Sequence, residues 1–223
     1  MNRAMSTIKM NQIKNIFFDF DGVLADSLHV KTKAFYELYL PYGELVAQKV
    51  MKHHLENGGV SRYEKFKIYH RDFLGKSISE EEVQRLARQF SELVVQGVIA
   101  SPEVRGARKF LERFQDQCRY WIITGTPTEE MKKIARARGI EHFFVEICGS
   151  PTNKKSWVEA LLEKYALHPQ ETLFLGDAAS DYEAAKAYNL HFALRVHEDN
   201  KALFYDFNGL RFADFEQLIE LMA

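Results

Sequence analysis

The chain has 223 residues, of which 46% are hydrophobic and 27% are charged. This composition is typical of a globular protein, and the length allows one large domain or a core domain with a smaller insertion. The formal net charge is -1. No strong overall field therefore favours binding to nucleic acid or to an anionic membrane.

The first residues, "MNRAMSTIKMNQIK", contain charges but no apolar run of about seven residues, so we expect no secretory signal. No window approaches the length of a membrane span. The two cysteines, Cys118 and Cys148, lack a CxxC partner, and we expect both to be buried thiols in a reducing compartment. Together these features predict a cytoplasmic protein.

Short, nearly continuous apolar runs recur along the chain and end in small or polar residues. Such runs suit a parallel sheet that is covered on both faces. They lie at 15–20, 119–125, 142–149, 171–177 and 190–196, with a weaker run at 209–214.

Helical patterns separate these runs after about residue 103, at 126–139, 155–167 and 181–190. In the first pattern, Thr126 and Glu129 fit a capping box, Pro127 suits the first helical position and Gly139 suits the end. Alternating strands and helices predict an α/β fold with a Rossmann-like wound parallel sheet.

Residues 26–100 interrupt this alternation, because they contain no clear strand and are mostly helical in pattern. Ser79 and Glu82 fit a helix cap, and 56–62 fits a turn between two helices. We therefore predict an α/β core built from 1–25 and 103–223, with a helical insertion and its linkers at 26–102.

Ligands of open parallel sheets bind beyond the carboxyl ends of the strands. Taken alone, each polar residue there has a plain structural explanation: a carboxylate as a turn or helix cap, Thr124 as a buried threonine, a lysine as a surface charge. Together, several carboxylates at one edge would repel one another unless a hard cation such as Mg²⁺ offset them. The residues that follow the predicted strands at this edge are Asp19, Asp21, Thr124, Gly125, Lys154, Lys155, Asp177 and Asp181.

The same segments carry a resemblance to a known family. "DFDGVLADS" (19–27), "IITGT" (122–126), "NKK" (153–155) and "GDAASD" (176–181) occur in the order of the four motifs of the haloacid dehalogenase superfamily. The chain is similar to its phosphoglycolate-phosphatase-like hydrolases, and the helical insertion resembles their C1-type cap domain.

The resemblance implies roles for the acidic residues. Asp19 would be the nucleophile that forms an aspartyl-phosphate, and Asp21 would be the general acid and later the base. Mg²⁺ would be held by Asp19, by the backbone carbonyl of Asp21 and by Asp177, with Asp181 acting directly or through a water.

The resemblance also implies a phosphate site made of Gly22, Thr124, Gly125 and a lysine, with Thr124 and the lysine also serving catalysis. Lys154 is favoured as that lysine and Lys155 is the alternative. In the helical cap, Arg62 would recognise a second anionic group of the substrate, such as a carboxylate, with help from Lys65. The alternative interpretation of this segment is a capped helix start, in which Arg62 and Lys65 are solvated basic residues.

The predicted activity is a Mg²⁺-dependent phosphatase acting on a small phosphorylated metabolite. A phosphosugar mutase of the same superfamily is the alternative, and a non-catalytic binding module is the third hypothesis. Asp21 argues against carbon–halogen cleavage, which needs no acid for the leaving group. The natural substrate and the oligomeric state are not readable from the sequence.

Overall fold

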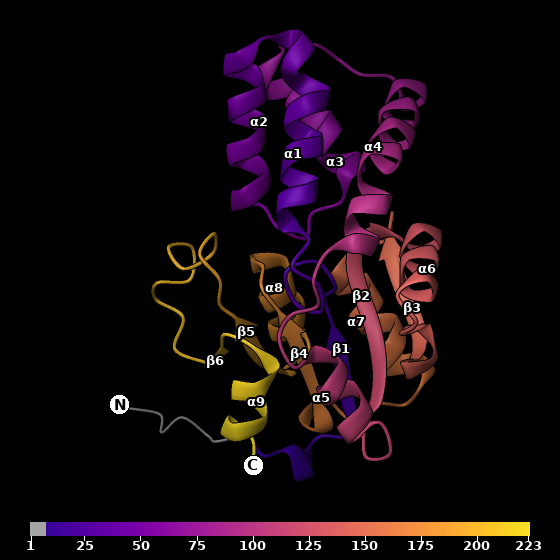
Figure 1. Ribbon diagram of the computed structural model, residues 1–223, viewed down its shortest axis with the longest axis vertical. Helices are drawn as coiled ribbons and strands as arrows, with labels where there is room; N and C mark the ends of the chain where they lie inside the picture. The colour runs from indigo at the N-terminus through magenta and orange to yellow at the C-terminus, as the bar shows by residue number, and fades with distance from the viewer. Residues whose placement is uncertain (1–7) are drawn as a thin grey trace.

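Six parallel strands form the central sheet, in the order β3-β2-β1-β4-β5-β6, as Figure 1 shows. The computed structural model describes residues 8–223. Every predicted apolar run forms a strand, so the wound α/β architecture is confirmed. The strands are β1 Asn15–Phe18, β2 Arg119–Pro127, β3 Phe144–Ser150, β4 Thr172–Gly176, β5 His191–Arg195 and β6 Leu210–Phe212.

Helices cover both faces of the sheet because alternate residues of each strand point to opposite sides. Phe18 packs in one apolar cluster with residues of α5, α6 and α9, and Phe17 packs in the other with residues of α7 and α8. These helices are α5 Ala107–Phe114, α6 Thr128–Ala137, α7 Lys154–Lys164, α8 Ala179–Ala187 and α9 Phe215–Leu221.

The central strand β1 is held firmly by aromatic contacts. Phe17 meets the rings of Trp121 and Phe174 edge to face, at centroid distances of 5.5 and 6.1 Å. Such pairs stabilise by about 0.5–1.5 kcal/mol beyond the area that they bury. Directly after the last residue of β1, the backbone amide of Asp19 donates to the Leu175 carbonyl at 2.9 Å. The position of Asp19 is therefore set by the sheet itself.

Four of the five α-helices between β1 and β2 stand over the carboxyl ends of the strands, drawn in indigo to magenta in Figure 1. We call them the cap. The capping box of Ser79 and Glu82 is confirmed at the start of the longest of them, and the turn expected at 56–62 lies between two of them. They are α1 Leu28–Tyr39, α2 Glu44–Glu56, α3 Arg62–Ile68 and α4 Glu80–Ala100.

The predicted start of α6 is wrong. Strand β2 runs on to Pro127, which pairs with Ser150 of β3, and the helix begins at Thr128 without a side-chain cap. Thr126 cannot cap the helix because its hydroxyl bonds Lys31 and Asp21 instead. The predicted end is confirmed, since Gly139 follows the helix with a φ of +66°.

Arg138, directly after α6, attaches the core to the end of the cap. One nitrogen of its guanidinium donates to the carbonyls of Val98, Ile99 and Ser101, at 3.0, 2.9 and 2.7 Å. These carbonyls lie at the C-terminal end of α4, where they have no partner within the helix. The arginine thus fixes the returning linker against the core.

Among residues 8–223, none of the helices has the length and apolar character needed to cross a bilayer.

Candidate active site

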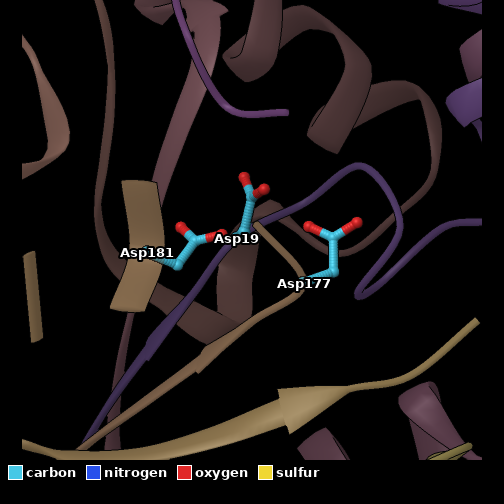
Figure 2. A group of neighbouring side chains, drawn as sticks. All are labelled: Asp19, Asp177 and Asp181. Atoms are coloured by element: carbon cyan, nitrogen blue, oxygen red, sulfur yellow. The ribbon is translucent and has the colours of Figure 1, made fainter. Parts of the chain in front are cut away.

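Three buried carboxylates meet where β1 and β4 end. Asp19 follows β1, Asp177 follows β4 and Asp181 lies in the first turn of α8. Oxygen atoms of all three lie within 4.8 Å of one another, and Asp19 lies between the other two in Figure 2. The sheet order reverses between these strands, which is where wound sheets bind their ligands. The predicted convergence of acids is therefore present.

Lys154 is the cation that joins this cluster. Its Nζ lies 2.9 Å from Oδ2 of Asp19 and 2.6 Å from Oδ1 of Asp181. The lysine is buried at the start of α7, whereas Lys155 is exposed to solvent. Asp181 also accepts the Ala178 amide at 3.1 Å, so it caps α8 as well. The geometry favours Lys154 over Lys155.

Burial is the main reason that the pKa of Asp19 rises to about 8, despite the charge of Lys154. The neighbouring Asp181, Asp177 and Asp21 push this pKa in the same upward direction. Burial also raises the pKa of Asp181. One ammonium group therefore does not offset the negative charge collected here. A set of oxygen donors with excess negative charge fits a hard divalent cation such as Mg²⁺.

Asp21 faces a different set of partners. Its carboxylate accepts from the Ser27 hydroxyl at 2.6 Å, from the Thr126 hydroxyl at 3.2 Å and from Lys31 of the cap. Burial alone would raise the pKa of Asp21, but Lys31 and these hydrogen bonds together lower it. The pKa values of the neighbouring Asp21 and Asp19 carboxyls are therefore shifted in opposite directions, because their partners differ.

Sequence reasoning missed the partners of two acids. Lys31 lies in α1, where a lysine is normally a surface charge, and no local pattern distinguishes it. His197 Nε2 lies 2.9 Å from Oδ2 of Asp177, and Asn200 donates to the Asp177 carbonyl at 2.8 Å. Both follow β5, whose carboxyl end lies at the same sheet edge. That position was the signal by which they could have been found.

Gly22 and Thr124 lie at this edge too. Gly22 has a φ of +78°, and a Cβ there would lie 2.2 Å from Oδ2 of Asp177, so only glycine fits. Its amide donates to the Ala25 carbonyl at 2.8 Å and serves the turn after β1. Thr124 is buried, and its hydroxyl accepts the Thr126 amide at 3.2 Å.

A loop of the cap closes over the cluster. Ser180 of α8 donates to the Gly58 carbonyl at 3.2 Å. A Cβ on Gly125 would lie 2.7 Å from the Gly59 carbonyl oxygen, and a Cβ on Gly59 would lie 2.8 Å from Nζ of Lys154. The cavity between cap and core is lined by residues of both, including Asp19, Thr124 and Gly125 from the core.

Arg62 lines the same cavity but is buried in an ion pair. Its guanidinium binds both carboxylate oxygens of Glu130 in α6, at 2.6 and 3.0 Å, and the Ser91 hydroxyl at 2.8 Å. It also lies 4.5 Å from the centre of the Phe90 ring. The reading of Arg62 and Lys65 as solvated basic residues is wrong, because both are buried.

Comparison with known proteins identifies a family that the chain matches. Residues 13–189 match the model of the haloacid dehalogenase-like hydrolase family. Phosphoglycolate phosphatase of Pasteurella multocida is 28% identical over 189 residues, which are 79% of this chain and 82% of that protein. The Haemophilus influenzae enzyme of the same name is 24% identical over 95% of this chain and 99% of its own.

Solved structures share the fold. A protein described as a predicted phosphoglycolate phosphatase from Haemophilus somnus superimposes with a TM-score of 0.72 and 21% identity, covering 95% of this chain and 99% of that one. Beta-phosphoglucomutase of Clostridium difficile superimposes with a TM-score of 0.73 at 19% identity, and the match covers 94% of this chain and 97% of that one. The motifs, the fold and the family match agree, and the chain belongs to the haloacid dehalogenase-like hydrolases.

Proposed function

We propose that the protein is a Mg²⁺-dependent phosphatase that hydrolyses a small phosphorylated metabolite through an aspartyl-phosphate on Asp19. The observation that carries this proposal is the placement of Asp19 against Lys154, with Asp177 and Asp181 within 4.8 Å. The similarity to phosphoglycolate phosphatases supports the same reaction class.

In the first step, a carboxylate oxygen of Asp19 attacks phosphorus and the bond to the ester oxygen breaks. Asp21 gives its proton to the departing alcohol. Because the two acids are two positions apart on an extended segment, their side chains can address one phosphoryl group. Asp21 must be protonated for this step, so its contact with Lys31 has to loosen when substrate binds.

In the second step, Asp21 takes a proton from a water that attacks the acyl phosphate, which releases inorganic phosphate and restores Asp19. The hydrogen bonds from Ser27 and Thr126 hold Asp21 in its ionised form, and this form suits the role of a base. Thr124, Gly125 and Lys154 would donate to the phosphate oxygens during both steps, beside the turn that Gly22 permits.

A magnesium ion would be held by Asp19, Asp177, Asp181 and the backbone carbonyl of Asp21. When bound, it would supply positive charge to the phosphoryl oxygens and orient them for in-line attack. The observation behind this assignment is the excess of buried oxygen ligands over cations, with Lys154 as the only described lysine in the cluster.

A phosphosugar mutase is the second candidate, because beta-phosphoglucomutase shares the fold. A mutase returns the phosphoryl group to a second hydroxyl instead of to water. Isomerisation of a sugar phosphate that depends on a catalytic amount of the bisphosphate would identify it. Release of inorganic phosphate without isomerisation supports the phosphatase.

Asp19→Asn should abolish turnover of para-nitrophenyl phosphate, because an amide cannot form the acyl phosphate. We expect a loss of at least about 1,000-fold, within the range seen when a nucleophile is removed. Circular dichroism should show an intact fold. Wild-type rates in the Asp19→Asn variant would refute the assignment of the nucleophile.

Chelation tests the metal. EDTA should silence hydrolysis, and added Mg²⁺ should restore it. Independently of activity, Mg²⁺ should raise the melting temperature of the chelated protein, because it binds the folded state and relieves repulsion among the carboxylates. Asp177→Asn should weaken this shift. Full activity in excess chelator would reject the metal.

Gly59→Ala tests the close approach of the cap loop. The added methyl group would press against Lys154 and Ser180, so turnover should fall by about tenfold or more. Gly75→Ala is the matched control, since Gly75 also has a positive φ, of +62°, but its Cβ would meet nothing within 4 Å. Equal effects of both variants on turnover would contradict the importance of the close contact between the Gly59 loop and the site.

Arg62→Ala and Glu130→Ala test the buried pair. Each should destabilise the protein by about 3–5 kcal/mol, because a buried charge loses its partner. The double variant should lose clearly less than the sum, as measured by urea unfolding. The role of Arg62 in substrate recognition stays a prediction. It requires the KM of the substrate to rise in Arg62→Ala but not in Glu130→Ala.

A further inference from the structure

The cap contributes two lysines and one arginine to the wall of the active-site cavity: Lys31, Lys65 and Arg62. Two of them have carboxylate partners, since Lys31 binds Asp21 and Arg62 binds Glu130. Among residues 8–223, no carboxylate lies within 4.0 Å of the Lys65 ammonium group, which forms no salt bridge. Lys65 is thus the basic residue of this wall whose charge is left unmatched.

Lys65 is also almost fully enclosed, with 1% of its surface exposed. Its Nζ lies 2.8 Å from Nδ1 of His54 and 3.4 Å from the His54 carbonyl. The Phe35 ring lies against both, with its centre 5.5 Å from Nζ and 4.7 Å from the centre of the imidazole. A lysine ammonium carries three donors, so this environment leaves one without a partner among the described residues.

Such an arrangement is costly for the protein alone. Burial, reinforced by Lys31 and Lys154, lowers the pKa of Lys65 well below its usual value. Burial lowers the pKa of His54 in the same way. Apolar side chains of similar size in place of Lys65 and His54 would remove the cost of burying two polar groups without a carboxylate partner. The pair is therefore better explained by an anion that enters the cavity than by stability.

We propose that Lys65, oriented by His54, binds a carboxylate of the substrate, at a point separate from the phosphate that is cleaved. This assignment rests on the proposed phosphatase function and narrows it: the substrates are phosphate esters of small hydroxy acids. One compact ammonium suits a monovalent carboxylate. The planar guanidinium of Arg62 would also suit a carboxylate, but it is already occupied by Glu130.

The sequence predicted Arg62 as the residue that recognises the anionic group and Lys65 as its helper, whereas the contacts favour Lys65. Both residues lie on α3, one helical turn apart, and both are buried. Only their partners differ, because α6 of the core brings Glu130 to Arg62 and brings no acid to Lys65. Specificity in this cap therefore depends on the side chain that the core leaves unpaired.

Two phosphonates that cannot be hydrolysed test this proposal as inhibitors of para-nitrophenyl phosphate hydrolysis. Phosphonoacetate carries a carboxylate where ethylphosphonate carries a methyl group. We expect the wild-type protein to bind phosphonoacetate about tenfold or more tightly than ethylphosphonate, as the loss of a buried charge partner predicts. In Lys65→Met the two inhibition constants should become nearly equal.

Lys67→Met is the matched control. Lys67 lies on the same helix, has an exposed side chain and pairs with Glu80 at 3.4 Å. The preference for phosphonoacetate should therefore stay as in the wild type. Lys65→Gln is the second variant, which keeps a polar group for His54 but removes the charge, and it should also lose the preference. For a variant with too little turnover, calorimetry with the same compounds replaces inhibition.

The outcomes are separable from those of the proposed function. A wild-type protein without preference for phosphonoacetate, or a folded Lys65→Met or Lys65→Gln variant that keeps it, would overturn the role of Lys65. Either result would leave the phosphatase assignment intact as long as the wild type hydrolyses the aryl phosphate and Asp19→Asn does not. Loss of the preference in both Lys65 variants, and not in Lys67→Met, supports the assignment.

Discussion

The site depends on the ion pairs of Lys154. This one ammonium group bridges Asp19, which follows the central strand, and Asp181, which lies on a helix more than a hundred residues away in sequence. Without it, three buried carboxylates would face one another with no cation between them. Since the penalty for burying charge is large and the lysine offsets only part of it, the arrangement stays short of positive charge and suits a metal ion. The charge of that ion would in turn offset the charge of a phosphate.

The sheet supplies the precision of this site and the cap supplies its enclosure. Asp19 is held by packing of Phe17 and Phe18 on opposite faces and by its own backbone bond to β4. The cap reaches the same point from the other side, through Lys31 and the backbone of Gly59. The proposed catalytic acids therefore follow strands of the core, while the residues proposed to recognise the substrate lie on helices of the cap.

Much of this could be predicted because strand ends are visible in the sequence. Short apolar runs located the six strands, and parallel strands bring their carboxyl ends to one edge, which placed Asp19, Asp177 and Asp181 together. Contacts between distant elements left no such pattern. Nothing local shows that Lys31 reaches Asp21, that Glu130 occupies Arg62, or that Thr126 belongs to β2 and not to the start of α6.

Helix α6 contacts the cap at both of its ends, and the two contacts differ in kind. Near its start, Glu130 forms a buried ion pair with Arg62, and just after its end, Arg138 binds carbonyls of the chain leaving α4. The second contact is to backbone close to the linker, so a swing of the cap about that point would keep it. A swing that uncovered the acidic cluster would separate Arg62 from Glu130, so breaking this buried ion pair would be part of the free-energy cost of opening the cavity.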